Sequence, residues 1–291
     1  MGSLTGSTLD RFTEYSAHEG LGLILATKRK LHEEKSEYQT IEVYETTKFG
    51  NLLTLDGLVM LTGRDNFIYH EMMVHPALFT HPDPKRILII GGGDCGCLQE
   101  ALKHPVERVD MVELDERVTR VSEQYFPELC ASNNDARASI YFLDGIKWVE
   151  DASEGSYDVI IVDSTDPIGQ AARLFQAPFY TDCRRALGDQ GILVVQSESP
   201  LLNRELIKSI HSEMDSAGFP EIATIHYPQC TYPSGWWSST LASAAMLGEF
   251  RSQEIGKHFA TRYYNKDIHA AAFALPGFLQ ETLARSLKTR D

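Results

Sequence analysis

From residue 86 onward, short apolar runs alternate with stretches of helical character, and this alternation restricts the fold more than any other feature of the chain. We expect strands at residues 87–90, 109–112, 140–143, 159–162 and 192–195. We expect helices at 98–104, 118–126, just after 145, 179–187 and 202–216, with further strands and a C-terminal helix beyond 218. Strands that are apolar throughout and separated by helices indicate a parallel sheet covered on both faces.

The residues before this region follow a different pattern. Ile41 and Val43 alternate with acidic residues, and residues 52–55 and 58–61 flank Asp56-Gly57, a dipeptide that favours a tight hairpin turn. Residues 65–75 are predicted to form a helix that ends at Pro76. The expected fold is therefore α/β, with a Rossmann-like, methyltransferase-type sheet that has helices on both faces and is preceded by a small antiparallel β domain. The expected domains are 1–64 and 65–291.

The charge and the ends of the chain limit its partners. Lys and Arg number 27 and Asp and Glu 41, which gives 27 − 41 = −14. Such a chain repels nucleic acid and anionic membranes and attracts cations. Residues 1–10 lack the basic and apolar parts of a signal peptide, and no apolar run approaches the ~18 residues of a membrane span. We expect a cytoplasmic enzyme that binds neither nucleic acid nor membrane.

A glycine-rich loop follows the strand at 87–90. Gly91, Gly93 and Gly96 satisfy G-x-G-x-x-G between a strand and a helix, and Glu113 ends the next strand, twenty residues after Gly93. This context suits an adenosine-type ligand, with the acid accepting hydrogen bonds from ribose hydroxyls. Two ligands fit the pattern: a dinucleotide such as NAD, or a molecule of the S-adenosylmethionine type.

Asp94 helps to choose between these ligands. It stands inside the loop, where the pyrophosphate of a dinucleotide would lie. A carboxylate there repels phosphate, whereas it attracts a sulfonium or ammonium group, so a ligand of the S-adenosylmethionine type is favoured. The other interpretation of Asp94 is a helix N-cap.

Acidic residues follow four consecutive predicted strands. They are Asp94, Glu113, Asp144 and Asp163. The carboxyl ends of parallel strands line one crevice, so we expect the four carboxylates to gather there, with Asp166 adding to their charge. Such a crevice suits a dication, and clustered carboxylates raise one another's proton affinity, so that one is poised as a general base.

No metal site is expected. Cys95 and Cys97 lack a second cysteine pair to complete a zinc site. His70 and His75 are five residues apart, which turns them roughly 140° from each other on a helix.

Together the motifs resemble those of the spermidine synthase (polyamine aminopropyltransferase) family, bacterial type. The resemblance rests on Ser36-Glu37-Tyr38-Gln39, Leu55-Asp56-Gly57, Tyr69-His70-Glu71, Gly91-Gly92-Gly93-Asp94, Asp144-Gly145, Asp163-Ser164-Thr165-Asp166-Pro167-Ile168-Gly169, Thr231-Tyr232-Pro233-Ser234-Gly235, Arg262-Tyr263-Tyr264-Asn265 and Phe273-Ala274-Leu275-Pro276. It covers nearly the whole chain in order, and it makes residues 65–291 the expected catalytic domain.

The resemblance implies transfer of an aminopropyl group from decarboxylated S-adenosylmethionine to putrescine or a similar amine, giving spermidine and methylthioadenosine. The donor is a co-substrate, so no cofactor is implied, and the expected assembly is a homodimer or homotetramer. Asp163 would be the general base. The resemblance assigns the donor to Gln39, His70, Asp94, Glu113, Asp144 and Gly145, and the acceptor to Tyr69, Asp166, Gln196 and Tyr232.

The chain also departs from the family pattern. Cys95 stands where the family usually has Gly, and Gln99 where it usually has Arg; Gln170 and Ala172 replace a usual Pro and Glu beside the adenosine site. Two alternatives to an aminopropyltransferase stay open: a methyltransferase that uses intact S-adenosylmethionine, and a non-catalytic member that binds a nucleoside or polyamine. The sequence does not identify the preferred acceptor amine.

Overall fold

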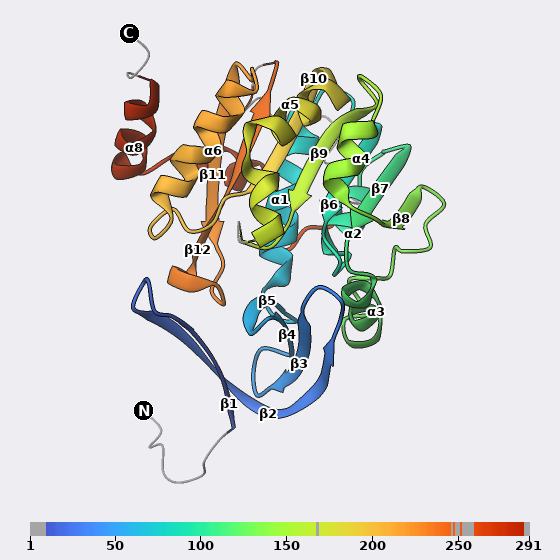
Figure 1. The fold of residues 1–291 in the computed structure, drawn as a ribbon, viewed down its shortest axis with the longest axis vertical. Coiled ribbons are helices and arrows are strands. Elements are labelled where there is room, and N and C mark those ends of the chain that lie inside the picture. Colours follow the sequence, from blue (N-terminus) through green and yellow to red (C-terminus); the bar gives the residue numbers. More distant parts are fainter. Residues whose placement is uncertain (1–9, 167–168, 246, 248–250, 252–258, 288–291) are drawn as a thin grey trace.

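A computed structural model describes residues 10–166, 169–245, 247, 251 and 259–287. Figure 1 shows a small β-sheet (blue) beneath a larger domain in which helices surround a second sheet. The small sheet is antiparallel throughout, in the order β1-β2-β3-β4-β5. Its strands are Arg11–Ser16, Leu21–Lys35, Thr40–Thr46, Asn51–Leu55 and Leu58–Thr62.

The expected hairpin turn lies between β4 and β5. Asp56 has φ 50° and Gly57 has φ 82°, so both residues adopt the left-handed conformation that tight hairpin turns require. The first strand, by contrast, was not expected from the sequence. β1 pairs with the start of β2 from Arg11 opposite Ala26 to Ser16 opposite Leu21, and its Phe12 is buried.

The larger sheet has seven strands in the order β11-β12-β10-β9-β6-β7-β8. They are β6 (Arg86–Gly91), β7 (Arg108–Glu113), β8 (Ala138–Phe142), β9 (Tyr157–Asp163), β10 (Leu187–Gln196), β11 (Glu221–Pro228) and β12 (Trp236–Ser243). The first five are parallel to one another, and β12 is antiparallel to both β10 and β11. The expected α/β class with a preceding antiparallel sheet is confirmed.

Alternate residues of the central strands face two separate cores. In β6, Ile87 and Ile89 pack into one core, and Leu88 and Ile90 pack into the other. The first core is covered by α1 (Asn66–Thr80), α2 (Gly96–Leu102) and α7 (Lys266–Ala272). The second core is covered by α4 (Gly145–Asp151), α5 (Ala177–Ala186) and α6 (Arg204–Ser216). Both faces of the sheet are therefore buried, as strands without an alternating pattern require.

Two more helices complete the described part of the chain. α3 (Glu116–Tyr125) joins the small sheet, because its Val118 and Val121 share a core with Ile41 and Val43. α8 (Gly277–Leu287) lies against α6. Among the described residues, no helix combines the length and apolar character needed to cross a bilayer.

The predicted end of α1 at Pro76 was wrong. The helix continues to Thr80 with Pro76 inside it. An interior proline costs about 3 kcal/mol, because it removes one backbone hydrogen bond and crowds the preceding turn. The residues beyond it, Ala77, Leu78 and Phe79, are all buried in the first core, and this burial outweighs the local preference.

Candidate active site

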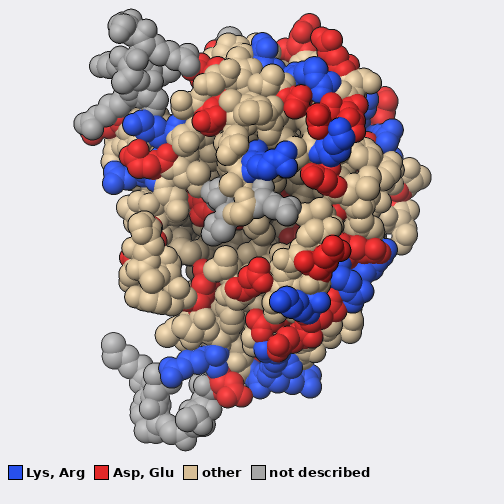
Figure 2. Space-filling view, viewed as in Figure 1, with Lys and Arg blue, Asp and Glu red and all other residues tan. Residues whose placement is uncertain are grey.

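A cavity of about 470 Å³ opens at the carboxyl ends of β6 to β9. Eight of the eleven residues assigned to the general base, the donor or the acceptor line it: Gln39, Tyr69, Asp94, Glu113, Asp144, Gly145, Asp163 and Tyr232. They come from both sheets, from α1 and from the loop before β12. Figure 2 shows acidic side chains (red) bordering the hollow between the two parts of the molecule.

A second cavity of about 70 Å³ adjoins the first. Asp166 and Gln196 line it, and Tyr69 and Tyr232 line both cavities. Of the eleven residues assigned to the general base, the donor or the acceptor, only His70 lines neither cavity. The arrangement therefore consists of a large chamber that leads past two tyrosine rings, 5.9 Å apart, into a small one.

Glu113 stands at the end of β7, inside the large cavity. Burial raises the pKa of its carboxyl to about 7, although the Asp115 backbone N–H donates to Glu113 Oε1 at 2.8 Å. Gly93 faces this carboxyl so closely that a Cβ at that position would lie 2.9 Å from Glu113 Oε2. Glycine in the loop thus lets the acid reach the cavity.

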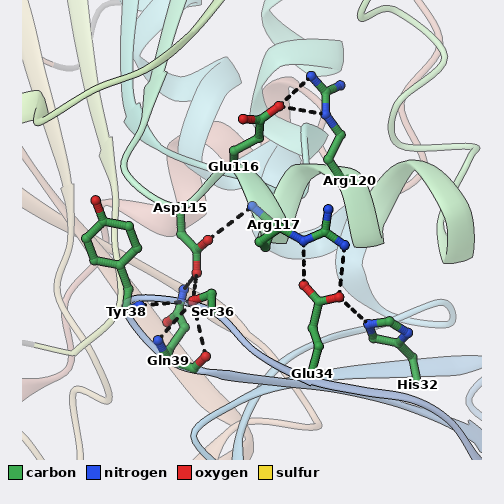
Figure 3. Close-up of polar contacts among 9 residues, drawn as sticks. All are labelled: His32, Glu34, Ser36, Tyr38, Gln39, Asp115, Glu116, Arg117 and Arg120. Atoms are coloured by element: carbon green, nitrogen blue, oxygen red, sulfur yellow. Dashed lines mark hydrogen bonds and ion pairs between the residues drawn. The ribbon is translucent and has the colours of Figure 1, made fainter.

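Gln39 belongs to the small sheet but lies in the same chamber. Its amide donates to Asp115 Oδ2 at 3.0 Å, and Ser36 Oγ donates to the same oxygen at 2.6 Å. Beside them Arg117 forms a two-bond ion pair with Glu34 (Figure 3). These contacts fix the loop before β3 against the start of α3, so that the N-terminal sheet supplies one wall of the cavity.

Asp144 and Gly145 mark the start of α4. Asp144 Oδ1 accepts from the backbone N–H groups of Ile146 (2.8 Å) and Lys147 (3.4 Å), as an N-cap does. A Cβ on Gly145 would lie 2.5 Å from Ile90 Cγ2, so this position needs glycine for the helix to approach β6.

Asp94 and His70 form a buried pair. His70 Nε2 is 3.2 Å from Asp94 Oδ1, and the Gly96 backbone N–H donates to that oxygen at 2.6 Å. Burial alone would lower the pKa of His70, but the Asp94 carboxylate outweighs it and raises that pKa to about 9. Burial likewise opposes ionisation of Asp94, yet the imidazolium charge holds its pKa below the usual value. His70 therefore lies behind Asp94, and Asp94 faces the cavity.

Gly96 makes room for this pair. A Cβ at that position would lie within 2.2 to 2.5 Å of three His70 ring atoms. The third glycine of the loop is thus required by the histidine of α1, in addition to any ligand.

Asp163 ends β9 and lines the large cavity. The Tyr69 hydroxyl donates to Asp163 Oδ1 at 2.6 Å, whereas Asp163 Oδ2 has no hydrogen-bond partner among the described residues. Burial, and secondly the charge of Asp94, raise the pKa of Asp163. The group therefore combines raised proton affinity with one buried oxygen that makes no hydrogen bond among the described residues.

Tyr232 is held by contacts on both sides of its loop. Its hydroxyl donates to the Met60 carbonyl at 2.5 Å. Next to it, Thr231 donates to buried Asp65 through its hydroxyl (2.8 Å) and its backbone N–H (3.2 Å). Asp65 lies just before α1, so the loop before β12 is tied to the helix that carries Tyr69.

Two carboxyl groups of the small cavity were missed in the sequence. Glu14 comes from β1 and Glu198 lies two residues past β10, facing Asp166. Burial, followed by the hydrogen bond to Asp166, raises the pKa of Glu198 to about 10, and burial also raises the pKa of Glu14. The search for acidic residues just after predicted strands would have found Glu198 if it had included β10. The residues around Glu14 give no indication that it reaches the cavity.

The segment that departs from the family pattern, residues 170–174, lies partly along the large cavity. Ala171, Arg173 and Leu174 line the large cavity, but Ala172 does not. The side chain of Gln170, together with Pro167 and Ile168, lies outside the described residues. Within the described part of the chain, no three His, Cys, Asp or Glu side chains are grouped as metal ligands.

Comparisons with known proteins show which family the chain matches. Residues 66–252 match the family described as "Spermine/spermidine synthase domain", and residues 11–63 match "Spermidine synthase tetramerisation domain". Polyamine aminopropyltransferases of Nitrosococcus oceani and Methylococcus capsulatus are 58% and 54% identical to the chain. The alignments cover 93% and 94% of this chain and 96% and 97% of the relatives.

Two solved structures are also similar. One is a spermidine synthase in complex with the transition state analogue AdoDATO, and the other is the spermidine synthase from Thermotoga maritima. Their TM-scores are 0.91 and 0.90, each at 34% identity, and each alignment covers 98% of both chains.

Proposed function

The chain belongs to the spermine/spermidine synthase family and is a polyamine aminopropyltransferase, and we propose that it transfers the aminopropyl group of decarboxylated S-adenosylmethionine to putrescine. The donor occupies the large cavity and the diamine enters the small one. The observation that carries this proposal is the position of Asp163, a buried carboxyl of raised pKa that lines the large cavity together with Tyr69 and Tyr232, the two tyrosines that line both cavities.

The large cavity suits the donor in charge and in hydrogen bonding. Glu113 accepts from the ribose hydroxyls, as acids at this position of the fold do. Gln39, Asp144 and Gly145 enclose the nucleoside. Asp94 attracts the ammonium end of the aminopropyl group, and His70 holds Asp94 ionised and in place. Intact S-adenosylmethionine would bring its own carboxylate toward Asp94, so this carboxylate also discriminates against a methyl donor.

The reaction follows from these positions. The sulfonium makes the adjacent aminopropyl carbon electrophilic. Tyr69, Tyr232 and Gln196 orient the near amine of the diamine, and the Asp163 carboxylate takes one of its protons. The nitrogen lone pair then forms the new C–N bond while the C–S bond breaks, and methylthioadenosine leaves neutral. Holding nitrogen and carbon in line supplies a large part of the acceleration.

The small cavity supports a diamine as acceptor. Asp166, Glu14 and Glu198 converge there, and burial raises the pKa values of the two glutamates. An ammonium group at the far end of the acceptor would reverse this effect, because an adjacent positive charge favours ionised carboxylates. The far amine therefore gains attraction that a monoamine cannot.

The direct test measures methylthioadenosine release from decarboxylated S-adenosylmethionine. A panel of putrescine, cadaverine, agmatine and spermidine is compared with a no-amine control. Fastest amine-dependent release with putrescine supports the proposal, and a different best amine would replace putrescine as the acceptor. Methyl transfer from intact S-adenosylmethionine, with no release in the panel, would reject the aminopropyl reaction.

We also propose that residues 1–64 and 65–291 are the two domains and that the chain assembles as a homodimer or homotetramer through the first of them. The match of residues 11–63 to a tetramerisation domain supports this assembly. Light scattering of the full chain gives its molar mass, and a monomer at micromolar concentration would contradict the proposal.

Donor-site affinity is expected to rise with pH. Burial raises the pKa of Glu113 to about 7, with Asp115 and Asp163 as its acidic neighbours. Ribose hydroxyls donate to the carboxylate, so binding favours the ionised form and releases a proton below pH 7. Methylthioadenosine should therefore bind about ten-fold more tightly at pH 8 than at pH 6. Calorimetry in two buffers of different ionisation enthalpy measures both the affinity and the number of protons released on binding. Glu113→Gln should abolish the pH dependence of the affinity. A flat profile for the unaltered chain would contradict the role of Glu113.

Glu198→Gln tests the acceptor chamber. The change removes a carboxyl group that the far ammonium should ionise, so the KM for putrescine should rise by about ten-fold or more, since hydrogen bonds to charged groups contribute about 1.5–3 kcal/mol. The KM for the donor should change little. A matched control is Glu205→Gln, an exposed glutamate in the first turn of α6. Equal putrescine KM values for the two variants would remove Glu198 from the acceptor site.

A further inference from the structure

Two thiols lie beside the loop that carries Asp94, and the proposed reaction uses neither. Cys95 is fully buried, and Cys130 is half-buried in the segment after α3. Cys130 Sγ lies 3.7 Å from the Asp94 carbonyl oxygen, and Cys95 Sγ lies 3.7 Å from the Gly93 carbonyl oxygen. The two thiols also interact with each other: hydrogen bonding to Cys130 and burial together raise the pKa of Cys95 far above its ordinary value.

The backbone around these cysteines holds them together. Cys95 has φ 70°, a left-handed conformation that residues with a side chain adopt at a cost of roughly 1–2 kcal/mol. One turn along α2, the Gln99 amide donates to the carbonyl oxygens of Glu128 (2.6 Å) and Leu129 (2.8 Å). Gln99 thereby docks the segment that ends in Cys130 against the helix that begins after Cys95. Both Cys95 and Gln99 are positions at which the chain departs from the family pattern.

We propose that Cys95 and Cys130 form a thiol–disulfide exchange site for small-molecule disulfides of the glutathione disulfide class, and that the resulting protein disulfide turns donor binding off. Cys130, the half-exposed thiol, attacks one sulfur of the small disulfide as a thiolate and releases one small thiol. Cys95 then loses its proton and attacks the Cys130 sulfur, which releases the second small thiol. Two protein thiols are oxidised by two electrons, the small disulfide is reduced to two thiols, and the two protons pass to those thiols.

Closing this bond must disturb Asp94. A disulfide requires a sulfur–sulfur distance of about 2.05 Å and a defined dihedral angle, so both thiols have to leave their present positions beside the loop carbonyl groups. Cys95 is covalently next to Asp94, and Cys130 Sγ touches the Asp94 carbonyl. The same shift changes the Asp94–His70 pair, whose atoms are 3.2 Å apart in the reduced chain. The effect on activity rests on the proposed function, whereas formation of the disulfide does not.

The test equilibrates the full-length reduced chain in glutathione buffers of increasing disulfide content. Intact mass and peptide mapping are expected to show a loss of about 2 Da and a Cys95–Cys130 cross-link. Methylthioadenosine binding and aminopropyl transfer are measured on the same samples. Donor affinity should fall about ten-fold or more as the cross-linked fraction rises, and dithiothreitol should restore it.

Two variants isolate the pair. Cys95→Gly suits the left-handed φ, and Cys130→Ser retains a polar group; both should keep donor affinity under oxidising conditions. Cys230→Ser removes the exposed cysteine and should cross-link as the unaltered chain does. A chain that stays reduced at Cys95 and Cys130, or oxidises only at Cys230, would overturn the exchange site. A cross-link without loss of methylthioadenosine affinity would overturn its effect on donor binding, whether or not transfer activity is found.

Discussion

Replacing Asp163 with asparagine is expected to lower turnover by about 10²–10⁴-fold while donor binding is largely kept. The amide cannot accept the proton that the amine must lose. The position tolerates the exchange sterically, and the Tyr69 hydroxyl, 2.6 Å from Oδ1 in the unaltered chain, can still donate to the amide oxygen. Single-turnover rates with saturating donor and putrescine give the effect on chemistry, and calorimetry with methylthioadenosine gives the effect on binding.

The matched control is Asp158→Asn, which makes the same exchange on the same strand. Asp158 accepts from the backbone N–H groups of Lys85 and Arg86, away from both cavities. Its loss should reduce stability but not turnover. Near-normal turnover of Asp163→Asn would move the general base elsewhere, and Tyr69 acting through water would then be the next residue to test.

Gly91→Ala is expected to have the largest effect on stability. Gly91 has φ 82°, and a Cβ there would lie 2.2 Å from the Asp163 carbonyl oxygen, a backbone atom of the neighbouring strand. Backbone strain of roughly 1–2 kcal/mol adds to an overpacking cost of about 1–3 kcal/mol. We expect a total loss of about 3 kcal/mol in the free energy of unfolding, together with displacement of Asp163. Urea unfolding monitored by fluorescence measures the loss.

Gly57→Ala separates the two contributions. Gly57 also has φ 82°, but no atom lies within 4 Å of the Cβ position. This variant should lose only the strain, roughly 1–2 kcal/mol, and should keep its activity. Equal losses in the free energy of unfolding for the two variants would show that the contact of the added Cβ with the Asp163 carbonyl does not destabilise the chain. Recovery of folded Gly57→Ala but not of Gly91→Ala would support the expected order.

The central sheet was predictable because most residues of its central strands are apolar. Ile87 to Ile90 leave no polar face, so a strand there must be buried on both sides. Because the carboxyl ends of parallel strands lie at one edge of the sheet, Asp94, Glu113 and Asp163 could then be predicted to lie together. The approach of Gly96 to His70 was not predictable, because it depends on how closely α1 packs against the glycine-rich loop. Periodicity shows which face of an element is buried, but not how near two elements come.

The remaining differences have the same origin. Pro76 is a helix-ending signal only when local preferences decide, and here the burial of Ala77 and Leu78 decides. Glu14 reaches the small cavity because β1 pairs with β2 and its carboxylate accepts from the Val59 backbone N–H at 2.7 Å. That contact joins residues 45 positions apart, and nothing near Glu14 in the sequence records it.

The wall that Gln39 contributes to the large cavity has a mechanical consequence. A ligand held between Gln39 on one side and Glu113 on the other contacts both sheets and so links them. Such a ligand binds only while the two sheets are in contact, so its binding free energy stabilises that contact. A saturating nucleoside should therefore delay separation of the N-terminal sheet as well as global unfolding. Conversely, any change that loosens the Gln39–Asp115 contact weakens the grip on the nucleoside without touching a strand end of the larger sheet.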